Sequence, residues 1–272
     1  MNGSTERSRP VKTAAVISHG RVDVRAAAER VRAVAADAGV LVLDDGTDPR
    51  EADLAIALGG DGTILRSLGH LLGSDVPVIG VNFGRVGFLA AIEPEGLDRD
   101  LRRVFAGEYV VLELPTLEVQ LDGQTQAAVN DVVTTSETLG RMVELAWAVG
   151  GEDLGTIPCD GMICATPSGS TAYNLSNGGP VLVRGLDAMA ITFIAPHSLH
   201  ARPLVVPRGL DVTLVNQTAD VDVAVLVDGR RVAEVPSGGR VAVRLGTQRS
   251  LLATLPETTF FGRYRETFTS HP

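Results

Sequence analysis

The hydrophobic pattern of the chain changes its period near residue 109, and this change limits the possible folds more than any other feature. From Thr13 to about Ala106, short β-branched runs such as AAVIS, VLVL, DLAIAL and VPVIGV alternate with helix-period segments. Beyond Tyr109, apolar residues recur at every second position, as in YVVLELPTLEVQLDGQ. The first pattern predicts a doubly wound, Rossmann-like parallel sheet covered on both faces by helices. The second predicts a β-sandwich-like domain, so the fold class is α/β plus all-β.

The domain boundary is predicted near residues 107–111. We therefore expect an α/β domain over residues 1–110 and a β-rich domain over residues 111–255, with turns at Asp122-Gly123 and Asp228-Gly229. The tail, residues 256–272, is aromatic and basic, unlike the strands before it. Packing back onto the first domain is one option for this tail, and its role stays open.

The composition is that of a globular protein, with 272 residues of which 44% are hydrophobic and 21% are charged. No apolar run approaches the roughly 20 residues that span a bilayer, and the start of the chain lacks the order of a secretory signal. We therefore expect a cytoplasmic protein without a membrane partner. The net charge of −9 argues against a nucleic-acid partner. Cys159 and Cys164 fit no metal or disulfide pattern and are expected to be buried free thiols.

The segment ALGGDGTILR predicts a strand, a tight turn and the start of a helix. Three glycines in it leave room for an anion to approach the backbone: Gly59, Gly60 and Gly62. Asp61 would repel a bare phosphate, so it makes sense if it binds a phosphate-bridging metal or accepts a proton from an attacking hydroxyl. The alternative is a plain βα turn in which Thr63 caps the helix. The segment matches neither the dinucleotide fingerprint nor the P-loop pattern.

A second segment, residues 159–180, combines an acid, hydroxyls, a tyrosine and glycines in CDGMICATPSGSTAYNLSNGGP. Ser168, Ser170 and Thr171 can bond to a base edge or a phosphate, and the ring of Tyr173 can stack. The alternative is a hydroxyl-capped short helix with Tyr173 in the core.

Five segments together resemble the NAD kinase family in order and spacing. They are GGDGTILR, GVNFGRVGFLA at 80–90, VNDVV at 129–133, CDGMICATPSGSTAYNLSNGGPVL at 159–182 and APHSLHARPLVV at 195–206. The resemblance covers about residues 55–230. GGDGT alone is less specific, because diacylglycerol and sphingosine kinases share it and phosphofructokinases carry it more loosely.

The resemblance implies phosphorylation of the adenosine 2'-hydroxyl of NAD, giving NADP, with ATP or, in some members, inorganic polyphosphate as donor. Asp61 matches the acid regarded as the general base. Because a carboxylate is a weak base toward an alcohol, we expect it to orient the hydroxyl and to take the proton late. A divalent cation, Mg²⁺, is expected as cofactor to neutralise the phosphates, and its ligands stay unknown.

The resemblance also assigns the other site residues. Asn130 and Asp131 match a pair that is Asn-Glu in many members, so the acid here is one methylene shorter; the alternative is a polar pair ending a strand. Asp160 resembles the acid on the nicotinamide side of NAD, and Ala195 lines the substrate through its backbone. The residues expected around adenine and the first ribose are Ser168, Thr171, Ala172, Tyr173 and Ser176. The expected phosphate-binding residues are Gly59, Gly60, Gly62, Thr63, Arg66 and Arg141.

Three classes of function are compatible with these motifs: a dinucleotide kinase, a lipid kinase sharing GGDGT, and a non-catalytic NAD(P)-binding regulator. A lipid kinase would need an interfacial surface, and the sequence shows no basic amphipathic helix to supply one. Retention of Asp61 favours catalysis over regulation. The expected partners are NAD and ATP or polyphosphate. The resemblance further implies a homodimer or homotetramer, in which a neighbouring subunit often completes the substrate site.

Overall fold

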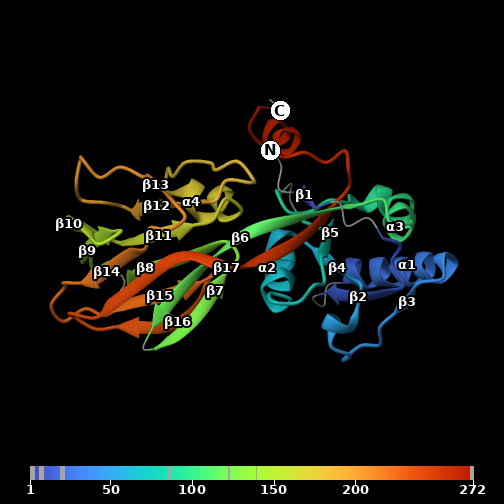
Figure 1. The fold of residues 1–272 in the computed structure, drawn as a ribbon, viewed down its shortest axis with the longest axis horizontal. Helices are drawn as coiled ribbons and strands as arrows, with labels where there is room; N and C mark the ends of the chain where they lie inside the picture. Colours follow the sequence, from blue (N-terminus) through green and yellow to red (C-terminus); the bar gives the residue numbers. More distant parts are fainter. Residues whose placement is uncertain are drawn as a thin grey trace. The chain divides into compact units, whose positions relative to one another are not determined.

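The computed structural model describes residues 4–5, 9–18, 22–84, 87–121, 123–138 and 140–269. Asp122 of the predicted turn, and Arg85 and Val86 of the second family motif, lie outside these residues. The chain divides into two compact units (Figure 1). The first comprises Met1–Glu113 with Arg249–Pro272, and the second comprises Leu114–Gln248.

The first unit contains alternating strands and helices in the order that the sequence predicts. Its elements are β1 (Ser4–Thr5), β2 (Thr13–Ser18), α1 (Val22–Ala38), β3 (Leu41–Val42), η1 (Pro49–Glu51), β4 (Leu54–Gly59), α2 (Asp61–His70), β5 (Val78–Asn82), η2 (Pro94–Gly96), α3 (Leu97–Phe105) and α5 (Phe260–Phe268), with the outer parts of β6 (Val110–Leu121) and β17 (Arg240–Thr254). The Ala-rich helix α1 ends before Gly39, which adopts a positive φ of 71° as expected of a helix-terminating glycine.

Strands β3, β2, β4, β5 and the end of β17 form a parallel sheet in that order. Successive side chains of a strand point to opposite faces. On β5, Ile79 joins the core cluster that contains Val31 of α1 and Leu101 of α3. A Cβ at the next residue, Gly80, would instead lie 2.2 Å from Cδ1 of Ile64 in α2. Helices therefore cover both faces, and the predicted doubly wound sheet is confirmed.

The second unit is almost entirely β-structure. Its elements are the remainders of β6 and β17 with β7 (Gln124–Ala128), β8 (Asp131–Ser136), β9 (Val143–Val149), β10 (Glu152–Cys159), β11 (Gly161–Ala165), η3 (Gly169–Thr171), α4 (Tyr173–Ser176), β12 (Ala188–Ile194), β13 (Leu204–Pro207), β14 (Val212–Asn216), β15 (Val223–Val227) and β16 (Arg230–Val235).

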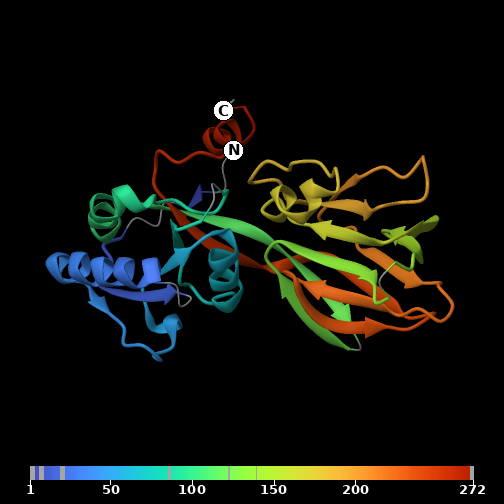
Figure 2. The ribbon, with the colours of Figure 1, turned by 180° about the vertical axis from the view of Figure 1, so that it is seen from behind.

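Two antiparallel layers of this unit enclose one core (Figure 2). One layer is a six-stranded sheet in the order β13-β12-β11-β8-β15-β16. The other contains β10, β9, β14 and β17 in that order, and β6 pairs with β7. Met162 and Ile191 of the first layer share a cluster with Leu145 and Leu214 of the second. The predicted β-sandwich-like domain is thus confirmed.

Cys159 and Cys164 are buried and free, as predicted. Within the described ranges, no helix has the length and apolarity needed to cross a bilayer.

Candidate active site

The glycine turn of the first unit joins β4 to α2. Strand β4 ends at Gly59, Gly60 is the N-cap, and α2 begins at Asp61. A Cβ on Gly59 would lie 2.4 Å from Oγ1 of the buried Thr63, so any larger residue would displace the first turn of the helix. No side chain caps α2, which removes the alternative in which Thr63 is the cap. No side chain therefore caps the backbone N–H groups of Asp61 and Gly62, whereas those of Thr63 and Ile64 donate to the carbonyl of Gly60 at 2.9 and 3.3 Å.

Asp61 is held in one orientation by the loop that follows β5. Its Oδ2 accepts a hydrogen bond from the backbone N of Phe88 at 2.8 Å, and its Oδ1 accepts one from the backbone N of Leu89 at 3.2 Å. A Cβ on Gly87 would lie 2.4 Å from Oδ1, so glycine is required there for this close approach. The side chain is partly exposed, and each oxygen keeps further acceptor capacity. The carboxylate can therefore accept a further hydrogen bond while it keeps those from Phe88 and Leu89.

The other expected phosphate-binding residues of the turn differ in exposure. Gly62 and Arg66 are exposed, and Gly60 is partly exposed. Arg66 places its Nη2 3.5 Å from Oγ1 of Thr63. Gly59 and Thr63 are buried and shape the turn from inside.

In the second unit, one edge of the six-stranded sheet gathers most of the expected NAD-binding residues. Strands β8 and β11 are antiparallel, with Asp131 opposite Ala165, so the start of β8 lies beside the end of β11. The backbone N of Thr166 donates to the carbonyl of Asn130 at 2.8 Å. The segment that follows, η3 and α4, carries Ser168, Thr171, Ala172, Tyr173 and Ser176.

Two buried polar atoms at this edge have no hydrogen-bond partner in the described part of the chain. They are Oδ1 of Asn130 and Oγ of Ser168, and the two residues are only 8% and 7% exposed. Leaving such an atom unpaired costs about 1–3 kcal/mol. Their arrangement is therefore suited to a ligand that supplies polar groups.

Tyr173 is 45% exposed, so the alternative that placed its ring in the core is wrong. Asn174 fills the buried position instead. Its Nδ2 donates to the carbonyls of Ser170 and Pro180, and its Oδ1 accepts from Oγ1 of Thr192 at 2.7 Å. The asparagine thus anchors the short helix to β12 and leaves the tyrosine ring outside.

The sequence predicts Asp228 only as part of a turn, but the structure places its side chain at the site. Its Oδ1 accepts from the backbone N of Asn130 at 2.7 Å and of Asp131 at 3.2 Å, and its Oδ2 accepts from the backbone N of Val129 at 2.9 Å. The backbone N of Asp228 donates to the carbonyl of Asp131 at 3.0 Å, and its φ is +49°. One carboxylate therefore fixes the backbone of the Asn130-Asp131 pair.

The two acids at this edge lie close to each other: Asp131 is 6% exposed, and Asp228 is partly buried. Burial, with a smaller contribution from the charge of Asp228, raises the pKa of Asp131 to about 7. Burial also raises the pKa of Asp228, against the opposing effect of its backbone donors. Near neutral pH, Asp131 is therefore in part protonated.

This shift predicts a pH-dependent stability. The folded protein keeps the Asp131 proton up to about pH 7, whereas the unfolded chain releases it near its ordinary value of 3.8. The folded state thus binds more protons between these values, so the free energy of unfolding falls as pH rises from about 4 to about 7, by roughly 4 kcal/mol at most. Urea unfolding at pH 5 and pH 8 should show a flatter dependence in Asp131→Asn than in the wild type. Equal slopes in the two proteins would contradict the assignment, and Asp222→Asn, an exposed acid, is the control.

Asp160 and Ala195 lie at the other end of the strands of the same sheet, away from Asn130. The backbone N of Asp160 donates to the carbonyl of Ile194 at 2.9 Å, and Ala195 has a φ of +42°. Strand β11 separates Asp160 from Thr166, a distance of about 20 Å at roughly 3.3 Å per residue. Within one chain, the structure therefore does not bring these two residues to the Asn130 edge.

Arg141 is exposed beyond the end of β8, and its backbone N donates to the carbonyl of Thr138 at 3.1 Å.

Among the described residues, no group of three His, Cys, Asp or Glu side chains could hold a metal ion. A magnesium ion bound mainly through nucleotide phosphates needs only one or two protein carboxylates, and Asp61 is the acid at the glycine turn.

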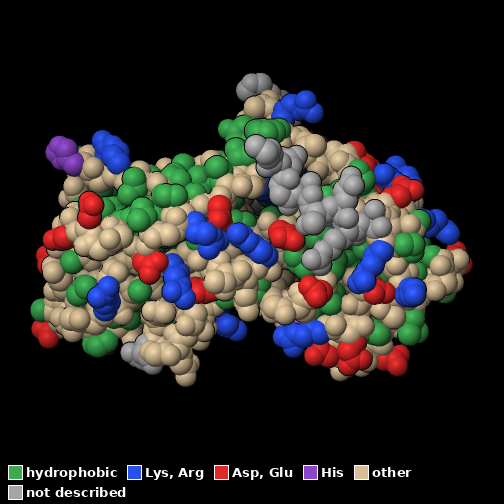
Figure 3. All heavy atoms as spheres, in the orientation of Figure 1, with side chains coloured by type: hydrophobic (Ala, Val, Ile, Leu, Met, Phe, Trp, Pro, Cys, Tyr) green, Lys and Arg blue, Asp and Glu red, His purple; other side chains and the backbone are tan. Residues whose placement is uncertain are grey.

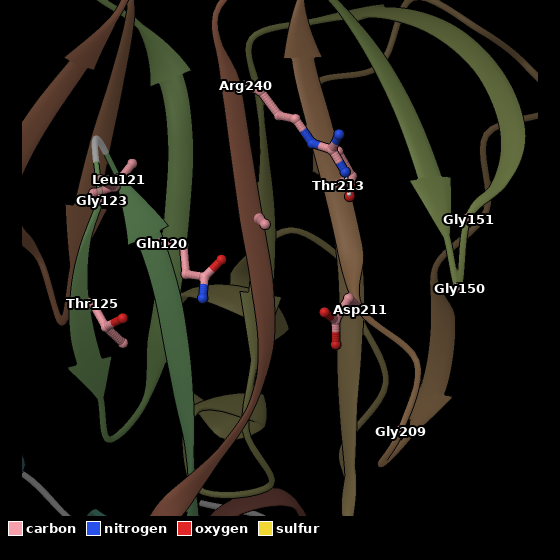
Figure 4. Close-up of a pocket in the computed structure, with 11 residues that line it drawn as sticks. Gln120, Leu121, Gly123, Thr125, Gly150, Gly151, Gly209, Asp211, Thr213 and Arg240 are labelled. Carbon is pink, nitrogen blue, oxygen red and sulfur yellow. Dashed lines mark hydrogen bonds between the residues drawn. The ribbon is translucent and has the colours of Figure 1, made fainter.

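A groove of about 720 Å³ lies elsewhere on the second unit (Figure 4). Gln120, Asp211 and Arg240 point from its walls, and Arg240 Nη2 lies 3.1 Å from Oγ1 of Thr213. None of the expected site residues lines it.

The chain combines a Rossmann-like unit, which carries an acid in a glycine turn, with a β-sandwich unit that has polar residues along one sheet edge. This combination defines the class of protein to which the chain belongs. Two family models match the chain, the ATP-NAD kinase N-terminal domain over residues 4–109 and the ATP-NAD kinase C-terminal domain over residues 129–255. The chain therefore belongs to the NAD kinase family, which confirms the resemblance found in the sequence.

Individual relatives agree with this placement. The NAD kinase of Thermomicrobium roseum is 38% identical over 261 residues, covering 93% of this chain and 89% of the relative. The NAD kinase of Heliobacterium modesticaldum is 41% identical over 222 residues, covering 80% and 78%.

Two solved structures share the fold. An Archaeoglobus fulgidus NAD kinase in complex with ATP has a TM-score of 0.78 at 27% identity, covering 94% of this chain and 97% of that one. Yeast NADH kinase complexed with NADH has a TM-score of 0.85, covering 97% and 89%; at 22% identity it supports the fold alone.

Proposed function

We propose that this protein is an NAD kinase that transfers the γ-phosphoryl group of ATP to the adenosine 2'-hydroxyl of NAD, giving NADP and ADP. The observation that carries the proposal is the Asp61 carboxylate, fixed by the backbone N–H groups of Phe88 and Leu89 yet partly exposed. A fixed acceptor beside a helix N-terminus suits a hydroxyl that attacks a phosphate.

In the proposed reaction, the 2'-oxygen forms a bond to the γ-phosphorus while the bond from that phosphorus to the β,γ-bridging oxygen breaks. ADP leaves with the bonding electron pair, and Asp61 receives the hydroxyl proton late in the step. Before that, the carboxylate orients the hydroxyl by accepting its hydrogen bond. The backbone N–H groups of the glycine turn and the guanidinium of Arg66 bind phosphate oxygens.

NAD is proposed to bind at the Asn130 edge of the second unit. Oδ1 of Asn130 and Oγ of Ser168 would find partners there, and the exposed ring of Tyr173 would stack on adenine. Asp131, partly protonated near neutral pH, can donate as well as accept a hydrogen bond. Thr171, Ala172 and Ser176 complete the proposed adenosine site.

A divalent cation, Mg²⁺, belongs to the proposal. It would be held mainly by phosphate oxygens, and it would neutralise phosphate charge. Inorganic polyphosphate is the alternative donor, and NADH is the alternative acceptor.

We further propose that Asp160, Ala195 and Arg141 act on the site of a second copy, in a homodimer or homotetramer. The separation of Asp160 from the Asn130 edge supports this. So does the apolar surface near the edge strand β13, where Leu199, Leu204 and Val205 are 89%, 40% and 43% exposed. Figure 3 shows hydrophobic side chains gathered over this region, above α4, β12 and β13. We also propose a cytoplasmic location.

The purified protein should form NADP from NAD and Mg-ATP, measured in a dehydrogenase-coupled assay. EDTA should abolish the activity, and parallel reactions with polyphosphate and with NADH determine the donor and the acceptor. A lipid extract is the control for the lipid-kinase alternative. NAD binding without product would indicate a regulator, and phosphorylation of lipid without NADP formation would indicate a lipid kinase; either result contradicts the proposal.

A further inference from the structure

The C-terminal helix α5 presents an aromatic stripe. Phe260, Tyr264 and Phe268 follow one another at four-residue spacing, which places them on one face of a helix. The ring centroids of Phe260 and Tyr264 are 6.4 Å apart, and those of Tyr264 and Phe268 are 4.9 Å apart. Phe261 lies on a different face of the helix and is 67% exposed, and its ring contacts that of Phe260 edge-on at 5.6 Å. On the face drawn in Figure 3, hydrophobic side chains gather over α5.

This stripe packs against the residue whose backbone binds Asp61. The ring of Phe88 lies 6.2 Å from that of Phe260 and 5.7 Å from that of Phe268, within the usual range for aromatic pairs. Phe88 is 9% exposed. Because its backbone N donates to Oδ2 of Asp61, a shift of the ring would move that donor.

A second contact ties the same loop to α5. Nη2 of Arg263 donates to the carbonyl of Ala90 at 2.8 Å, and Nη1 lies 3.4 Å from Oε1 of Glu93. The Arg263 side chain is only 12% exposed. Glu93 in turn accepts from Nδ2 of Asn82 at 3.1 Å, and Oδ1 of Asn82 accepts from the backbone N of Gly84 at 3.0 Å. The loop is therefore held near both of its ends.

We propose that α5 positions the Asp61 carboxylate, with Phe268 and Arg263 as positioning residues. This inference rests on the proposed function for its effect on the reaction. Loss of either contact frees the segment that carries the Phe88 and Leu89 donors, so Asp61 samples orientations in which it cannot hold the 2'-hydroxyl. Misalignment of a catalytic group acts on the reaction step more than on substrate binding.

The variants Phe268→Ala and Arg263→Ala test the inference, with Phe261→Ala as the matched control on the same helix. We expect kcat to fall roughly 10- to 100-fold in the two test variants, with KM for NAD within about twofold of wild type. The control should keep the wild-type kcat. Arg263→Lys, which retains a donor for the Ala90 carbonyl, should recover part of the loss. Equal kcat in test and control variants would overturn the inference.

A second readout does not depend on turnover. Amide hydrogen exchange at Phe88 and Leu89, measured by NMR, should be at least about tenfold faster in Phe268→Ala than in Phe261→Ala, because local opening exposes these groups. Thermal unfolding identifies any variant that fails to fold, and Arg263→Lys then serves in its place. If wild type forms no NADP, the proposed function fails, whereas unchanged exchange rates in the variants reject the positioning role by themselves.

Discussion

Replacing Asp61 with Asn lowers kcat by roughly 10²–10⁴-fold, the range expected when a positioned proton acceptor is lost. The amide has nearly the shape of the carboxylate but cannot take the hydroxyl proton. Its NH₂ group would also face one of the two backbone donors that now hold the side chain, Phe88 N or Leu89 N. Coupled assays give kcat, and calorimetry gives the affinity for NAD, which should stay within about twofold of wild type.

Asp45→Asn is the control for this variant, because Asp45 is an acid of the same unit whose side chain is 90% exposed and pairs with Arg32 at 3.1 Å. It should match the wild type in both measurements. Retention of more than about a tenth of the wild-type kcat in Asp61→Asn would mean that the acid is not the proton acceptor.

Replacing Asp228 with Ala gives the largest expected loss of stability, about 3–5 kcal/mol in the free energy of unfolding. The change leaves the backbone N–H groups of Val129, Asn130 and Asp131 without their acceptor in a buried site. The Asn130-Asp131 pair then loses its fixed orientation. Urea unfolding measures the stability.

Asp220→Ala is the matched control, because Asp220 has a φ of +58°, close to the +49° of Asp228, and is exposed. Both substitutions place alanine in the same unfavourable backbone region, so the difference between them reports the hydrogen bonds that the Asp228 carboxylate accepts. Asp228→Asn keeps one acceptor oxygen and should fold, with KM for NAD raised roughly tenfold by the loss of about one hydrogen bond to the pair. Equal stability of the two alanine variants would contradict the role assigned to Asp228.

The periodicity of the sequence predicted the architecture because each half follows one regular pattern. On β5, Ile79 and Gly80 face opposite helices, and a sheet covered on both faces favours such a run without alternating polar residues. The glycine turn was also predictable, because the strand, the acid and the helix are adjacent in the chain. Local signals of this kind need no knowledge of distant contacts.

The supports of the site were not predictable from local patterns. Asp228 and Asn130 are 98 residues apart, and a DG pair in a hairpin reads as a turn whether or not its carboxylate binds another strand. Arg263 and Ala90 are 173 residues apart. Only the sheet register and the packing of α5 bring these groups together, so the sequence left the role of the tail open.

The separation of Asp160 and Ala195 from Asn130 also depends on the arrangement of the strands, which local patterns do not show. The segment of residues 159–180 is continuous in sequence, but β11 runs through it and carries its two ends to opposite ends of the strands of the sheet. The sequence predicts one cluster of site residues from this segment, but the strand places Asp160 far from the residues that follow Thr166.

The most direct measurement is a crystal structure of the protein with NAD bound. We expect a carboxylate oxygen of Asp61 within about 3.2 Å of the adenosine 2'-hydroxyl, the reach of a hydrogen bond. An NAD molecule whose adenosine ribose lies far from Asp61, with that carboxylate turned to solvent, would contradict it.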